Sequence, residues 1–213
     1  MIKILIADDH AIVRDGLRMI LEAHADLTVV ETASNGRDAI AKAKSLQPDI
    51  IIMDIAMPEL NGIDATRAIC KSAAQSRVII LSMHHTSEHV HRALSAGSRG
   101  YLLKGSAGTE VVKAVRAVMN GALFFGKGVE QPEGAASTAC PTAKSPLETL
   151  SDREREVLQL VVEGKTSAAI ADILSLSPKS VETYRSRLMK KLGIDDIPTL
   201  VKFAVQHGIT PPL

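Results

Sequence analysis

Short apolar runs alternate with amphipathic stretches between residues 1 and 121, and this rhythm restricts the fold more than any other feature of the chain. The runs are almost continuously apolar, which is typical of strands buried on both faces of a sheet. The stretches between them repeat apolar residues at helical spacing. The sequence therefore predicts an α/β domain with a doubly wound, five-stranded parallel sheet and helices on both faces. The predicted strands are Ile2–Ala7, Leu27–Ala33, Ile50–Met53, Val78–Leu81 and Gly100–Leu103.

A change of texture after residue 121 indicates a second domain. The segment from Gly126 to Ser145 reads GKGVEQPEGAASTACPTAKS, is rich in small and turn-forming residues, and has no apolar period. Such a segment is typical of a linker, or of a loop that orders only on assembly. We therefore predict a first domain over residues 1–121, a linker over 122–146 and a small all-helical domain over 147–213. The expected helices are Ser151–Gly164, Ser167–Leu174, Pro178–Leu192 and Thr199–Gly208.

Composition excludes several classes of protein. No apolar run approaches the roughly 20 residues that span a bilayer, and the opening MIKILIADDH is too short and too acidic for a signal peptide. Two cysteines, Cys70 and Cys140, make neither a disulfide framework nor a zinc site. We expect a cytoplasmic protein with no membrane partner. Aromatic residues are only 2% of the chain, which argues against stacking on single-stranded nucleic acid.

Polar side chains follow four of the predicted strands where each strand ends. Asp8 and Asp9 follow the first strand, Asp54 the third, Ser82 the fourth and Lys104 the fifth. Ligands of doubly wound sheets bind at the carboxyl ends of the strands, so these groups should converge. Three carboxylates repel one another, and a hard cation such as Mg²⁺ relieves that repulsion. A hydroxyl and an ammonium beside them suit a phosphoryl group, with Asp54 as the candidate nucleophile.

Each of these residues also has an ordinary structural explanation. Asp8 or Asp9 alone is most often a helix N-cap, because a helix follows. Ser82 alone is a turn residue, and Lys104 alone is a solvated lysine. The prediction of a site therefore depends on all five residues reaching one edge of the sheet in this order.

Four motifs at the strand ends closely resemble the receiver domain of two-component response regulators. They are IADDH, MDIAMPELNG, ILSMH and GYLLK. The resemblance implies that a sensor histidine kinase phosphorylates Asp54. It implies a magnesium ion held by Asp9, Asp54 and the backbone carbonyl of Ala56, with Asp8 in the acidic pocket.

The same resemblance assigns a switch to two further residues. Ser82 and Tyr101 correspond to the hydroxyl and the aromatic residue of the family's switch pair. Tyr101 is expected to turn inward when Ser82 moves toward the phosphoryl group. Its ordinary explanation is an amphipathic surface tyrosine.

The helical region contains a helix-turn-helix pattern. Ser167–Leu174 and Pro178–Leu192 are joined by only three residues, and Ser177 before Pro178 is a typical N-cap followed by proline. The second of these helices holds five lysines and arginines against one acid, whereas residues 151–213 as a whole hold nine basic and eight acidic residues. A basic helix in a near-neutral domain is a plausible phosphate-facing element, although a charge run by itself is usually a solvated face.

This segment resembles the LuxR-type helix-turn-helix, and both modules together resemble a NarL/FixJ-type response regulator. The resemblance implies that Pro178–Leu192 enters the DNA major groove, and that the last helix, Leu200 to His207, pairs two domains as a dimer. Base edges are expected at Glu182, Thr183 and Ser186. Phosphate contacts are expected at Lys179, Arg185, Arg187 and Lys190.

The sequence therefore predicts a phosphorylation-controlled transcriptional regulator that is not a dedicated enzyme, although it accepts a phosphoryl group and loses it by autodephosphorylation. Its expected partners are a sensor histidine kinase, double-stranded promoter DNA and a second copy of the chain, with RNA polymerase as a further candidate. One alternative is a phosphorelay protein whose helical domain binds protein. The other is a dehalogenase-like phosphatase, which would place its nucleophile in a DxD motif after an early strand, whereas Asp8 and Asp9 are adjacent.

Overall fold

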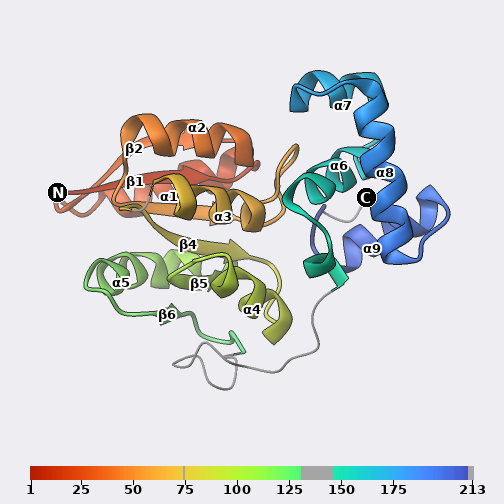
Figure 1. The fold of residues 1–213 in the computed structure, drawn as a ribbon. Helices are drawn as coiled ribbons and strands as arrows, with labels where there is room; N and C mark the ends of the chain where they lie inside the picture. The colour runs from red at the N-terminus through yellow and green to blue at the C-terminus, as the bar shows by residue number, and fades with distance from the viewer. Residues whose placement is uncertain (74, 131–145, 211–213) are drawn as a thin grey trace. The chain divides into compact units, whose positions relative to one another are not determined.

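The computed structural model describes residues 1–73, 75–130 and 146–210 of the 213-residue chain. The chain divides into two compact units, Met1–Cys140 and Pro141–Leu213 (Figure 1). The predicted linker over 122–146 lies mostly outside the described residues. No helix in the described parts of the chain is both long and apolar enough to cross a membrane.

The first unit is built on a parallel sheet whose strands follow the order β2-β1-β3-β4-β5-β6. The five predicted strands are confirmed. The sixth strand, β6, was not predicted, because it has only two residues and lies in the segment expected to be linker. Directly after β6, the Gly126 N–H donates to the Tyr101 carbonyl of β5 (2.9 Å). The strands are β1 (Ile2–Ala7), β2 (Leu27–Ala33), β3 (Ile50–Asp54), β4 (Arg77–Ser82), β5 (Gly100–Leu103) and β6 (Phe124–Phe125).

Helices cover both faces of this sheet, as expected for buried parallel strands. One face packs against α1 and α5 through a core that includes Leu21 and Val115, and the other packs against α2, α3 and α4 through a core that includes Ile69 and Val90. Both cores are almost wholly aliphatic, which matches the continuous apolar strands of the sequence. The helices are α1 (Ala11–Glu22), α2 (Gly36–Leu46), α3 (Gly62–Ser72), α4 (Ser87–Ser95) and α5 (Ala107–Met119).

The second unit is all-helical, and capping residues set its helix ends. Ser151 and Glu154 form a reciprocal capping box at the start of α6, and Ser177 caps α8 ahead of Pro178. The last helix begins at Ile197, two residues before the prediction, because the Asp196 carboxylate accepts from the Thr199 N–H and caps the helix there. After a 3-10 turn over Pro146–Thr149 come α6 (Asp152–Val162), α7 (Ser167–Leu174), α8 (Pro178–Leu192) and α9 (Ile197–Gln206).

Candidate functional site

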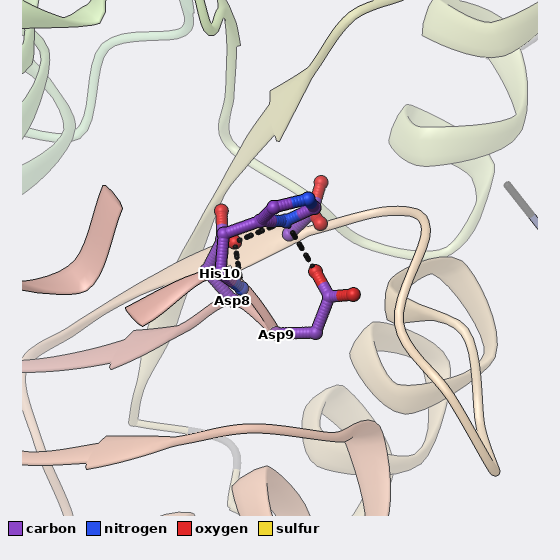
Figure 2. A group of neighbouring side chains, drawn as sticks. Asp8, Asp9 and His10 are labelled. Carbon is purple, nitrogen blue, oxygen red and sulfur yellow. Dashed lines mark hydrogen bonds and ion pairs between the residues drawn. The ribbon is translucent and has the colours of Figure 1, made fainter. Parts of the chain in front are cut away.

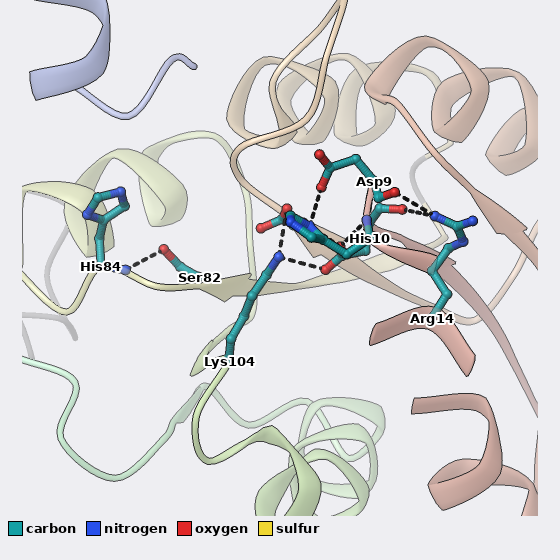
Figure 3. A network of polar contacts seen from close by, with 8 residues as sticks. Asp9, His10, Arg14, Ser82, His84 and Lys104 are labelled. Carbon is teal, nitrogen blue, oxygen red and sulfur yellow. Dashed lines mark hydrogen bonds and ion pairs between the residues drawn. The ribbon is translucent and has the colours of Figure 1, made fainter. Parts of the chain in front are cut away.

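The sheet brings the five predicted polar residues to one edge. β1 ends immediately before Asp8, while Asp54 and Ser82 are the last residues of β3 and β4. The strand ends are aligned by the parallel register, in which Ala7 faces Met53, Asp54 faces Leu81, and Ser82 faces Leu103. Figure 3 shows Lys104 reaching from the end of β5 toward the acidic side chains.

Lys104 forms the centre of the site. Its Nζ lies 2.9 Å from Asp8 Oδ2 and 2.9 Å from Asp54 Oδ2. Both carboxylates are buried, with exposed fractions of 0% for Asp8 and 2% for Asp54. Apart from the Lys104 ammonium, these two buried oxygens have no hydrogen-bond partner among the described residues, so two carboxylates share one positive charge.

The electrostatics of Asp54 follow from this arrangement. Burial, reinforced by the nearby Asp8 carboxylate and opposed by Lys104, raises the pKa of Asp54 from 3.8 to about 6. Although burial would lower the pKa of Lys104, the carboxylates of Asp54 and Asp8 raise it above its ordinary value. At neutral pH Asp54 is therefore an ionised, incompletely neutralised nucleophile next to a protonated lysine.

His10 completes a cluster that the sequence analysis did not include (Figure 2). Its Nδ1 lies 2.7 Å from Asp9 Oδ1 and 3.3 Å from Asp8 Oδ1, and its backbone N–H donates to Asp8 Oδ1 at 2.9 Å. Arg14 fixes the same turn by donating to the backbone carbonyls of Asp8 (2.7 Å) and Asp9 (3.1 Å). The available signal was a histidine, a common metal ligand, directly after two adjacent acids.

The acidic pocket has donors that suit a divalent cation. Asp8, Asp9, His10 and Asp54 each offer one ligand atom, and these atoms all lie within 4.8 Å of one another. Three buried carboxylate oxygens in this pocket have only Lys104 or His10 as a close polar partner among the described residues, namely Asp8 Oδ2, Asp9 Oδ1 and Asp54 Oδ2. Hard cations prefer such oxygen ligands, so the residues present fit a divalent metal ion.

The loop after β3 is held against the strand end by a glycine. A Cβ on Gly62 would lie 1.8 Å from the Asp54 carbonyl oxygen, so no larger residue fits without moving the backbone. The Gly62 N–H also donates to the Ile55 carbonyl (2.9 Å). This close approach fixes the turn that carries Ala56, whose carbonyl the receiver resemblance assigns to the metal.

The two switch residues are linked through the backbone of His84. The His84 N–H donates to Ser82 Oγ (3.0 Å), and the Tyr101 hydroxyl donates to the His84 carbonyl (2.8 Å). Tyr101 is completely buried, and burial raises its pKa to about 12. The resemblance led us to expect an inward turn on phosphorylation; in this structure the tyrosine already lies inward.

The loop between β4 and α4 also holds the segment that follows β6. The Glu130 N–H donates to the His85 carbonyl (3.2 Å), and the Glu130 carboxylate accepts from the Ser87 N–H (3.1 Å). Glu130 is the last described residue before the segment that leads to the helical unit. The loop between β4 and α4, called the switch loop below, therefore contacts the last described residue before that segment.

On the helical unit, α8 presents a polar face around a buried apolar stripe. Val181 and Leu188 are fully buried in the helical core. Of the predicted DNA contacts, Arg185 is half-buried, and the others are exposed, namely Lys179, Glu182, Thr183, Ser186, Arg187 and Lys190.

Two of the expected base-reading residues have partners within the unit. The Ser167 hydroxyl at the start of α7 hydrogen-bonds to the Glu182 carboxylate. The Thr183 hydroxyl donates to the Lys179 carbonyl one turn earlier (2.9 Å). The Glu182 contact fixes α7 against α8, so this residue supports the helix pair in addition to any contact outside it.

Comparison with known proteins divides the chain in the same way. Residues 4–116 match the response regulator receiver domain, and residues 148–204 match the luxR family of bacterial regulatory proteins. The chain is 36% identical to the response regulator UvrY of Escherichia coli strain K12 over 98% of this chain and 96% of that protein. It is 35% identical to the response regulator GacA of Pseudomonas syringae pv. syringae over 98% of each.

A solved structure extends this similarity to the fold. The RcsB response regulator of Salmonella typhimurium, described with conformational dynamism for DNA interaction, is 27% identical and covers 98% of each chain with a TM-score of 0.64. A structure of two RcsB dimers bound to two parallel DNAs is also 27% identical, over 95% of this chain and 96% of that one, with a TM-score of 0.57.

Proposed function

The chain belongs to the response regulators that join a receiver domain to a LuxR-type DNA-binding domain, and we propose that it accepts a phosphoryl group on Asp54 to control promoter binding. By its family the protein is a two-component transcriptional regulator and not a dedicated enzyme. The proposed donor is a sensor histidine kinase, and the proposed site of action is promoter DNA in the cytoplasm.

The contact of Lys104 with both buried carboxylates carries this proposal. An Asp54 carboxylate oxygen attacks phosphorus, forming an oxygen–phosphorus bond while the bond to the donor nitrogen breaks. Lys104 neutralises negative charge on the phosphoryl oxygens, and the Ser82 hydroxyl donates a hydrogen bond to one of them. A magnesium ion held by Asp9, Asp54 and the Ala56 carbonyl, beside Asp8, would supply further charge neutralisation. In autodephosphorylation, water would attack the phosphorus while its bond to the Asp54 oxygen breaks, which releases inorganic phosphate and returns Asp54 to its free carboxylate.

The hydrogen bonds of the β4–α4 loop support a route out of this site. If Ser82 turns toward the phosphoryl group, it gives up the His84 N–H as a donor partner. His84 is also bonded to Tyr101, and the next residue, His85, is bonded to Glu130. A shift in this loop therefore reaches the segment leading to the helical domain, as a two-state switch requires.

The exposed face of α8 supports the DNA-binding half of the proposal. We place this helix in the major groove, where Glu182, Thr183 and Ser186 read base edges. Lys179, Arg185, Arg187 and Lys190 contact phosphates, which orient the protein without selecting sequence. Pairing through α9 presents two reading helices together and raises affinity through effective concentration. RNA polymerase is a further proposed partner at the promoter.

The first test is the intact mass of the chain after incubation with Mg²⁺ and acetyl phosphate. The wild type and the matched exposed variant Asp26→Ala should each gain one phosphoryl group, whereas Asp54→Ala should gain none. A gain in Asp54→Ala would mean that another residue is the acceptor. Turnover of simple phosphate esters without net labelling would favour the phosphatase alternative.

The second test is the salt dependence of duplex DNA binding. Arg187→Ala and Lys190→Ala should each reduce the slope of log affinity against log salt by about one. Arg153→Ala, an exposed arginine on α6, should leave the slope unchanged. If the chain shows no salt-sensitive binding to duplex DNA, a phosphorelay protein whose helical domain binds protein is favoured instead. Equal binding by wild type and Asp54→Ala with phosphodonor present would break the link between the two domains.

A further inference from the structure

The geometry around His10 points to this imidazole as an additional metal ligand of the acidic pocket, one that biases the pocket toward first-row transition ions over Mg²⁺. The inference rests on the proposed cation site but concerns a residue outside the carboxylates and the carbonyl assigned to it. It also predicts a property that the oxygen ligands alone do not have.

The position of the ring carries the inference. His10 occupies the N-cap position of α1, yet its side chain makes no capping hydrogen bond. The ring turns back instead, and Nδ1 lies 2.7 Å from Asp9 Oδ1 and 3.3 Å from Asp8 Oδ1 (Figure 2). In an octahedral shell with metal–ligand bonds of about 2.1 Å, adjacent ligand atoms lie about 3 Å apart. The nitrogen therefore already lies near the spacing of a neighbouring ligand from each of the two oxygens.

Hydrogen bonds to the backbone hold the turn that carries the His10 ring. The His10 N–H is bonded to Asp8 Oδ1 at 2.9 Å, and Arg14 holds the carbonyls of Asp8 and Asp9. The turn is therefore rigid, while the His10 side chain is 60% exposed and free to adjust its torsions. A small rotation exchanges the contact with Asp9 for a bond to an ion that both residues share, with the ring proton on Nε2.

The chemistry of the ligand determines the selectivity. Carboxylate and carbonyl oxygens suit Mg²⁺, whereas a neutral imidazole nitrogen suits Co²⁺, Ni²⁺ and Zn²⁺. Mg²⁺ gains little from the nitrogen and keeps water in that position. Removing the imidazole should therefore weaken transition-metal binding far more than Mg²⁺ binding. If His10 is only an ion partner of Asp9, its removal should instead affect both ions alike.

The test is calorimetric titration of the full chain with Co²⁺ and with Mg²⁺, for wild type, His10→Ala, His10→Asn and His24→Ala. His10→Asn retains a polar side chain at the helix start but lacks the imidazole, and His24→Ala is a matched histidine removal beyond the other end of α1. Proton NMR of the samples with one equivalent of Co²⁺ adds a direct readout, because a cobalt-bound imidazole gives a strongly shifted, exchangeable ring N–H resonance.

We expect the Co²⁺ Kd to rise about tenfold or more in both His10 variants, with a Mg²⁺ change of less than about threefold. The shifted N–H resonance should be present in wild type and His24→Ala and absent from both His10 variants. Equal weakening of both ions, wild-type behaviour of His10→Asn, or retention of the resonance without His10 would each overturn the inference. Failure of the wild type to bind either ion would instead overturn the cation site of the proposed function.

Discussion

Each unit of the protein contains one buried acid whose pKa departs from its ordinary value, and the two pKa values shift in opposite directions. Asp54 in the receiver unit is 2% exposed, and Glu154 in the helical unit is 3% exposed. Burial opposes ionisation at both positions. The pKa of Asp54 is nevertheless raised to about 6, whereas the pKa of Glu154 lies below its ordinary value.

The partners of the two carboxylates explain the difference. Asp54 shares one ammonium, that of Lys104, with a second buried carboxylate. Burial would likewise raise the pKa of Glu154, but the hydrogen bond from Lys191 (2.7 Å) and that from the Ser151 N–H (2.7 Å) outweigh it. A buried acid that serves the fold is fully paired, whereas the proposed phosphoacceptor retains uncompensated charge that a cation or a phosphoryl group can use.

The largest expected effect is on the rate of phosphorylation, and it should be seen on removing Lys104 but not on removing Lys191. Lys104→Ala should reduce the rate of phosphorylation by acetyl phosphate about a hundredfold or more, because the charge developing on the transferred group loses its fixed cation. Lys191→Ala should leave this rate unchanged. Both rates can be measured by intact mass in saturating Mg²⁺. Similar rates for wild type and Lys104→Ala would remove the proposed role of this lysine.

Removing the paired acid should destabilise its unit. Glu154→Ala deletes half of a capping box and leaves Lys191 without its carboxylate, so the helical unit should lose about 2 kcal/mol of unfolding free energy. The measurement is native-state hydrogen exchange of the α6 and α8 amides in the full chain. Glu148→Ala, which removes an exposed acid nearby, is the control. A loss as small as that of the control would mean that the capping box contributes little.

Removing the charge of Asp54, the incompletely paired acid, should have the opposite effect and increase the free energy of unfolding of its unit. In the absence of divalent cations, Asp54→Asn should stabilise the receiver unit by about 1–2 kcal/mol at neutral pH. A carboxylate with a raised pKa destabilises the folded state above that pKa, so the gain should disappear as the pH falls through 6 toward 4. Hydrogen exchange of the β3 amides across this range tests the sign, with the exposed Asp15→Asn as control. A destabilised Asp54→Asn would show that the ion pair with Lys104 outweighs the cost of burial.

The smallest expected effect is the pH dependence of the helical unit. A lowered pKa means that ionised Glu154 contributes stability above 4.5, its unfolded value, and loses it as the pH falls through the lower folded pKa. Glu154→Gln should therefore cost about 1 kcal/mol at neutral pH, and the difference from wild type should shrink under acid conditions. A difference between Glu154→Gln and wild type that instead grows on acidification would contradict a lowered pKa of Glu154 and, with it, the contrast with Asp54.

Much of the site could be predicted from the sequence because its residues lie at the ends of recognisable strands. Asp8, Asp9, Asp54, Ser82 and Lys104 each follow or end an apolar strand, and parallel strands bring their carboxyl ends to one edge. His10 was missed because its role depends on a side-chain torsion at the start of α1. The internal partner of Glu182 was missed as well, since Ser167 lies on a different helix.

By itself, the sequence determined the order of the first five strands and of the helices along the chain, the helix-turn-helix with its caps, and the five polar residues that meet at the sheet edge. These features depend on periodicity and on hydrogen bonds between residues a few positions apart. Only the tertiary structure decided that Lys104 lies equally close to Asp8 and Asp54, that Tyr101 lies inward, and that Glu130 bonds to the switch loop. Those contacts join separate elements, so they depend on register, burial and rotamers, which no local pattern encodes.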